Sequence, residues 1–158
     1  MLIGETGIDR VCPVADASSC IPKYHFIAID KATGLKDDED GILGLWPANV
    51  SGLNEKYSRS LFIPEMVKSG AITQSILSFH LSGMDGKSYM DFGTPNPSAM
   101  KGGDPSSVVY IDSLKENAFW SNYVTGLRFT SNTSDLSVKV LTKSEAVTDT
   151  GTSCIIGP

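Results

Sequence analysis

The chain has little cysteine, little histidine, no long apolar run and no cluster of basic residues. A membrane-spanning helix needs about 20 consecutive apolar residues, and no stretch approaches that length, so we expect no membrane partner. The 158 residues include 13 Lys and Arg against 18 Asp and Glu, a formal charge of −5. Without a basic patch, the chain is not expected to bind nucleic acid. The first residues lack the basic and apolar regions of a signal peptide.

The three cysteines leave several interpretations open. Cys12 and Cys20 bracket a short polar loop, and a disulfide between them would contribute about 2.5 kcal/mol at most, because the closed ring is small. The two could instead stay reduced, or bind zinc with His25, although their spacing matches no common zinc pattern and a fourth ligand is missing. Cys154 is followed by two isoleucines, which favours a buried free thiol. We predict no metal site and no cofactor.

Glycine, proline, serine and threonine are plentiful between short apolar segments. Fifteen Gly and eight Pro suit short strands and tight turns better than a helical bundle. The pattern predicts an all-β fold with one or two short helices. Strands are expected at residues 1–11, 24–29, 75–82, 88–93, 108–111, 119–124, 127–129, 136–141 and 146–147.

A β-hairpin is predicted at residues 75–93. Apolar and polar residues alternate over residues 75–82, turn residues follow, and a second strand returns. His80 falls on the polar face of the first strand, so we expect it to be solvated and not catalytic.

A short helix and a buried strand are predicted before the hairpin. The helix is expected at residues 63–70, because Pro64 suits its first position and Gly70 the residue beyond its end. Ile42 and Leu43 are flanked by glycines, which predicts a short buried strand that another backbone passes closely. The acidic residues just before this strand do not fit the register of an EF-hand and predict a solvated turn.

The most specific motif is Asp149-Thr-Gly-Thr-Ser153, directly after the apolar residues 146–147. A carboxylate on a tight turn between hydroxyl groups has the chemistry of an acid protease, in which a second carboxylate shares its proton. Two other interpretations compete with this one. A serine hydrolase elbow at Ser153 would need glycine where Ile155 stands. A plain hairpin turn is the other, since Asp, Thr and Gly all suit turns.

From about residue 7 onward the chain resembles the pepsin-like eukaryotic aspartic proteases, peptidase family A1. The similar segments occur in the family's order: residues 7–11, the stretch Asp40-Gly-Ile-Leu-Gly-Leu45, the helix at 63–70, the hairpin at 76–82 and 90–93, the pair Phe119-Trp120, and residues 146–153 followed by Gly157-Pro158. The resemblance implies part of a two-lobed acid protease fold. The loop between Cys12 and Cys20 is similar to a variant in which a small disulfide interrupts the strand after the flap.

The resemblance also implies roles for the residues of the motif. Asp149 would be a catalytic aspartate, with Thr150 and Thr152 in support. Gly151, Thr152 and Ser153 would contact the substrate, a polypeptide. The implied reaction is peptide-bond hydrolysis by a water molecule activated between two aspartates, without a cofactor.

By the same resemblance, the chain is an internal fragment. The family's first catalytic loop and flap tyrosine would lie before residue 1, and the rest of the second lobe beyond Pro158. Residues 1–94 would end the N-terminal lobe, 95–105 would be a linker, and 106–158 would begin the C-terminal lobe. The missing lobe segments would be partners, and we expect the chain alone to be inactive. The alternative is a truncated or pseudo-protease that serves as a binding module.

The resemblance implies a secreted protein or one of a lysosome- or vacuole-like acidic compartment. In such a protein, Asn49 and Asn132 would be glycosylation acceptors, because each begins an Asn-x-Ser/Thr triplet.

Overall fold

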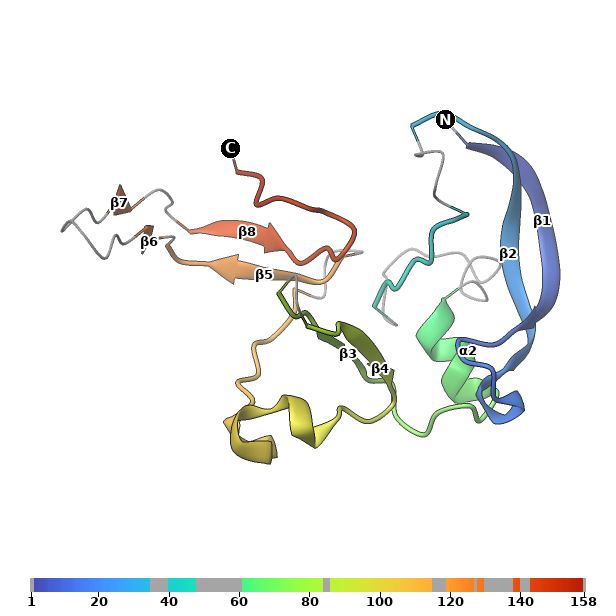
Figure 1. The fold of residues 1–158 in the computed structure, drawn as a ribbon. Coiled ribbons are helices and arrows are strands. Elements are labelled where there is room, and N and C mark those ends of the chain that lie inside the picture. The colour runs from blue at the N-terminus through green and yellow to red at the C-terminus, as the bar shows by residue number, and fades with distance from the viewer. Residues whose placement is uncertain are drawn as a thin grey trace. The chain divides into compact units, whose positions relative to one another are not determined.

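The structure is a computed structural model that describes residues 2–34, 40–47, 61–83, 86–114, 119–126, 128–129, 138–139 and 143–157. The described part consists of short strands and turns with one α-helix of seven residues (Figure 1). This composition confirms the predicted all-β class. Contacts divide the described residues into unit 1, up to Val109, and unit 2, from Tyr110 onward. Among these residues no helix has the length and hydropathy to span a bilayer.

The longest element of unit 1 is an antiparallel ribbon of two strands, β1 (Leu2–Val11) and β2 (Ile21–Ala32). The second strand exceeds its predicted range because cross-strand pairing continues to both ends of the ribbon. Gly7 lies opposite Phe26, and a Cβ atom at position 7 would come within 2.8 Å of the Phe26 ring. The ring therefore covers the glycine, which leaves no room for a side chain there.

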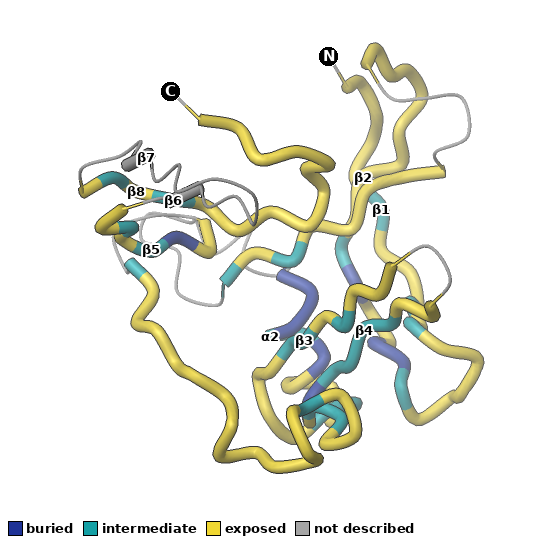
Figure 2. The backbone as a smooth tube through the Cα atoms, turned by 60° about the vertical axis from the view of Figure 1, so that its left-hand side comes forward, coloured by how far each residue is buried: buried dark blue, intermediate teal, exposed yellow. Residues whose placement is uncertain are grey.

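The core of unit 1 lies at the end of this ribbon that contains Ile21 and Tyr24 (Figure 2). Phe62 is 1% exposed, and its ring packs edge-on against Tyr24 at 5.4 Å and against Phe92 at 5.7 Å between centroids. The other buried members of the cluster are Ile21, Ile63 and Met66. The core thus joins the ribbon, the helix and the hairpin of unit 1.

Helix α2 (Phe62–Lys68) begins one residue before the predicted start. Pro64 is consequently the third helical residue and not the first, which is still within the turn whose N–H groups have no helical partner. Gly70, with φ of 77°, follows the helix as predicted, and the Ala71 N–H donates to the Met66 carbonyl at 3.0 Å. Glu65, whose side chain is 13% exposed, accepts a hydrogen bond at 3.1 Å from the exposed Lys68.

The predicted hairpin is confirmed as β3 (Leu77–His80) and β4 (Tyr89–Phe92). His80 is half-buried and not freely solvated, because its ring stacks on that of Tyr89 at 4.7 Å between centroids. The segment predicted as a linker forms three short 3-10 turns, Pro97–Ala99, Lys101–Gly103 and Pro105–Ser107. Its role between two lobes stays a prediction.

The described residues of unit 2 form two strand pairs. Strand β5 (Ser121–Val124) pairs with β8 (Ser144–Val147), and β6 (Arg128–Phe129) pairs with β7 (Val138–Lys139). Ser121 is fully buried, and its carbonyl accepts the Leu114 N–H at 2.8 Å. Strand β8 is the element that leads directly into the Asp149 motif.

Two strand predictions are wrong. Residues 40–47 are not a strand, and Ile42 and Leu43 are 71% and 45% exposed instead of buried. Residues 108–111 are also not a strand, and Tyr110 is 87% exposed. Both segments have the composition of strands, but a strand also needs a hydrogen-bonding neighbour, and no strand of the described part pairs with either.

Several predicted features lie outside the described residues. They are the acidic turn at residues 37–39, the tip of the hairpin at 84–85, the glycosylation acceptors Asn49 and Asn132, and parts of the strands predicted at 127–129 and 136–141.

Candidate active site

The Asp149 turn follows the end of β8 in unit 2. The Thr148 N–H donates to the Trp120 carbonyl at 2.8 Å and so continues the pairing of β8 with β5 by one residue. The chain then turns, and the Thr152 N–H donates to the Asp149 carbonyl at 3.2 Å. The pairing with β5 therefore anchors the backbone immediately before the carboxylate.

Both carboxylate oxygens of Asp149 accept hydrogen bonds from within the turn. Oδ1 accepts the Gly151 N–H at 2.9 Å, and Oδ2 accepts the Thr152 hydroxyl at 2.7 Å. A Cβ atom added at position 151 would lie 3.2 Å from Oδ1. Glycine at this position therefore leaves the carboxylate uncrowded.

These two hydrogen bonds determine the electrostatics of the group. The hydroxyl of Thr152, followed by the N–H of Gly151, lowers the pKa of Asp149 below its usual value, since both donors stabilise the charged form. The side chain is exposed, so burial does little to oppose this effect. Asp149 is therefore a solvent-accessible carboxylate with a defined orientation, whose charged form both donors favour.

Two other aspartates have similar local hydrogen bonds. Asp16 accepts the Ser18 N–H at 3.0 Å, and Asp104 accepts the Ser106 N–H at 2.9 Å. The side-chain hydroxyl of each serine also donates to the same carboxylate, and the pKa of each aspartate is lowered. Local geometry alone therefore does not single out Asp149. Its distinguishing features are the hydroxyl donor three residues later and the position after a paired strand.

The remaining residues of the motif lie on the same turn. Thr150, Gly151, Thr152 and Ser153 are all exposed, as a surface in contact with a substrate would be. The prediction that Cys154 is a buried thiol is wrong, because the residue is free but exposed. The two isoleucines after it are 89% and 81% exposed, so no apolar cover forms around the sulfur.

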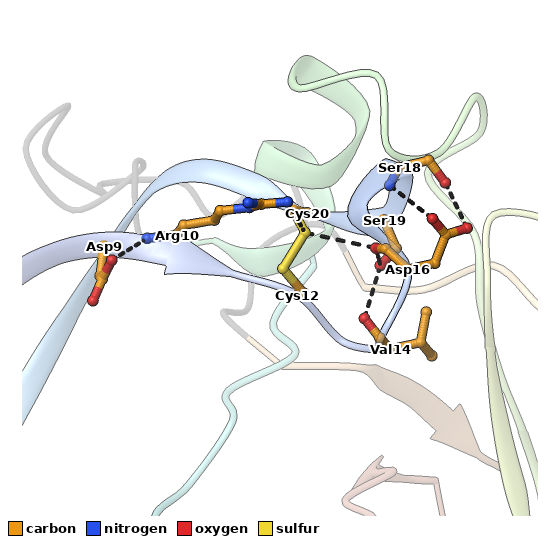
Figure 3. Close-up of a disulfide and its surroundings, with 8 residues drawn as sticks. All are labelled: Asp9, Arg10, Cys12, Val14, Asp16, Ser18, Ser19 and Cys20. Carbon is orange, nitrogen blue, oxygen red and sulfur yellow. Dashed lines mark hydrogen bonds between the residues drawn. A yellow bond between two sulfur atoms is a disulfide. The ribbon is translucent and has the colours of Figure 1, made fainter.

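The disulfide between Cys12 and Cys20 is present (Figure 3). It consumes both thiols, so the zinc interpretation with His25 is wrong. Sequence reasoning missed Arg10, whose guanidinium Nη2 donates to the sulfur of Cys20 at 3.2 Å. An arginine two residues before a cysteine was the only available indication.

A protein-family model, the eukaryotic aspartyl protease family, matches residues 11–158. The chain belongs to the eukaryotic aspartyl protease family. The match covers the β2 ribbon strand, helix α2, the hairpin and the Asp149 turn, and it supports a pepsin-like fold for the elements described above. No curated protein and no solved structure matches the chain significantly. The proteins of this family are hydrolases, and their substrates are polypeptides.

Proposed function

We propose that this chain contributes one of the two catalytic aspartates of an aspartic endopeptidase, and that Asp149 is that residue. The observation that carries the proposal is the Asp149 turn. An exposed carboxylate has one oxygen held by a backbone N–H and the other by the Thr152 hydroxyl, in a chain of the aspartyl protease family.

The mechanism requires two carboxylates with different protonation. Because like charges at close range cannot both ionise, one carboxylate keeps a proton while the other is charged. The charged one accepts a proton from water, the water attacks the peptide carbonyl, and the protonated one donates to the carbonyl oxygen. The lowered pKa of Asp149 suits the charged, proton-accepting role.

The neighbours of Asp149 follow from this role. Thr152 keeps Oδ2 oriented through its hydroxyl, and Gly151 leaves space beside Oδ1. Thr150 links the two catalytic turns across the cleft, and the exposed Gly151, Thr152 and Ser153 contact the substrate backbone. The substrate is a polypeptide, cleaved at acidic pH in a secreted or lysosome-like setting.

A second Asp-Thr-Gly or Asp-Ser-Gly does not occur in the sequence. The partner carboxylate, the flap and the missing lobe segments therefore come from another stretch of polypeptide, and the 158 residues alone show no turnover. If no partner carboxylate exists, the alternative is a non-catalytic binding module, because no second group is then present to donate a proton to the peptide carbonyl oxygen.

The test replaces Asp149 in the longer protein that also carries the family's first catalytic loop. Asp149→Asn removes the group that accepts a proton from water, so peptide cleavage at acidic pH should fall by at least about 100-fold. Asp104→Asn is the matched control, because Asp104 also caps its own turn through a serine, and it should keep the wild-type rate. Wild-type cleavage by Asp149→Asn would refute the assignment.

A further inference from the structure

The disulfide that closes the loop between β1 and β2 is asymmetric. Cys12 is an exposed residue, whereas Cys20 is 8% exposed and precedes Ile21 of the core. The Cys12 side of the disulfide therefore faces solvent, whereas the Cys20 side adjoins the core. Thiol–disulfide exchange depends on access to the attacked sulfur and on the stability of the thiolate that leaves.

Arg10 places a positive charge beside the sulfur of Cys20. Its guanidinium Nη2 donates to this sulfur at 3.2 Å, and a guanidinium at that position favours the charged form of a sulfur released from the disulfide. The nearest acidic group of the loop, Asp16, turns its carboxylate toward Ser18, to which it is bonded at 3.0 and 2.7 Å (Figure 3). Its charge is thus directed away from the sulfur.

Both protonation states of a released Cys20 have a partner. In the disulfide, the sulfur of Cys20 lies 3.2 Å from Arg10 Nη2 and 3.6 Å from the Asp16 carbonyl oxygen, so a released thiolate would have a donor nearby and a released thiol an acceptor. The loop itself is held by other bonds, since the Ser19 hydroxyl donates to the Asp16 carbonyl at 2.7 Å and to the Val14 carbonyl at 3.2 Å. The loop can therefore keep its shape when the disulfide opens.

We propose that the Cys12–Cys20 disulfide is a site of thiol exchange, in which an external thiol attacks Cys12 and Cys20 leaves. The attacking thiolate forms a bond to the sulfur of Cys12, the bond between the two cysteines breaks, and its electron pair stays on Cys20 as a thiolate. With a monothiol the product is a mixed disulfide on Cys12. With a dithiol, the second thiol attacks the mixed disulfide, releases the Cys12 thiolate and is itself oxidised to a disulfide.

The first experiment determines which sulfur is attacked. Oxidised protein is treated briefly with reduced glutathione, quenched with excess N-ethylmaleimide at neutral pH, and cleaved between the two cysteines at Asp16 for mass spectrometry. Glutathione should be found on Cys12 and maleimide on Cys20, in at least about tenfold excess over the reverse labelling, as expected when access and leaving-group stability act together. Equal labelling, labelling mainly on Cys20, or no reaction would overturn the proposal.

The second experiment tests the role of Arg10. Arg10→Gln removes the positive charge beside the leaving sulfur and should slow exchange by about three- to tenfold. Arg10→Lys keeps the charge and should restore most of the rate. Lys23→Gln, which removes an exposed cation of β2, should leave it unchanged. If Arg10 only held the loop in shape, Arg10→Gln would speed the exchange instead of slowing it, because a loosened loop exposes the disulfide to reduction.

Discussion

Expressed by itself, the 158-residue chain should bind a hydrophobic dye and unfold without a cooperative transition. Within the described residues the buried apolar side chains are few: Cys20, Ile21, Tyr24, Leu61, Phe62, Ile63 and Met66. Many large apolar side chains stay in contact with water. The elements of unit 1 therefore share a core that is small for the surface they present.

The size of the effect follows from three exposed side chains. Ile27, Ile42 and Leu81 are 63%, 71% and 74% exposed. Full burial of one such side chain stabilises the folded state by about 1.5–3 kcal/mol. The exposed fractions of these three side chains therefore correspond to roughly 3–6 kcal/mol of burial free energy that the isolated chain does not gain. The net stability of a whole domain is only about 5–15 kcal/mol. A partner that covers these residues would therefore change the stability by an amount comparable with the total.

The assay combines dye fluorescence, circular dichroism melting and calorimetry on the isolated chain. We expect dye binding at room temperature and broad transitions that differ between probes. Ile42→Ser is a matched variant: it should reduce dye binding and leave the melting profile unchanged, because the side chain is already mostly exposed. A sharp, reversible transition with equal calorimetric and van't Hoff enthalpies, and no dye binding, would refute the reasoning.

Two further predictions concern pH and use the longer protein. Thr152→Val removes the hydroxyl that most lowers the pKa of Asp149, so the acidic limb of the pH–rate profile should move to higher pH. Thr152→Ser keeps a hydroxyl and should leave the limb in place. An unchanged profile in Thr152→Val would exclude this role of the hydroxyl. Burial, and next the negative charge of Glu65, raise the pKa of Tyr24. The stability linked to Tyr24 is therefore fully present below about pH 10, the pKa in the unfolded chain, and is lost as pH rises through the folded value. Denaturant titrations of Tyr24→Phe should show a smaller loss of unfolding free energy at alkaline pH. An equal loss in the wild type and the variant would show that Tyr24 does not cause it.

Short-range features were predictable because their determinants lie close together in the chain. Helix α2 was expected within one residue of its observed start, since its capping positions and Gly70 act over a single turn. The hairpin of β3 and β4 was expected because alternating residues and a turn sit in one segment. The Asp149 motif was identified for the same reason: the donors to its carboxylate are two and three residues away.

The errors occurred where a residue's environment depends on distant segments. Ile42, Leu43 and residues 108–111 have strand composition, yet the described part offers them no pairing strand. Cys154 was expected to be buried on the basis of its apolar neighbours, and it is exposed with them. Composition states what a side chain would gain from burial, but it does not say whether another element is there to cover it.

The sequence by itself determined the class of fold, the local elements and the family, because periodicity, capping and a five-residue motif are properties of contiguous residues. Tertiary structure decided the pairing of β5 with β8, whose segments are about twenty residues apart. It also decided the burial of Phe62 between the ribbon and the hairpin and the approach of Arg10 to Cys20. These contacts join different elements of the chain, and their free energy depends on a geometry that no single element specifies.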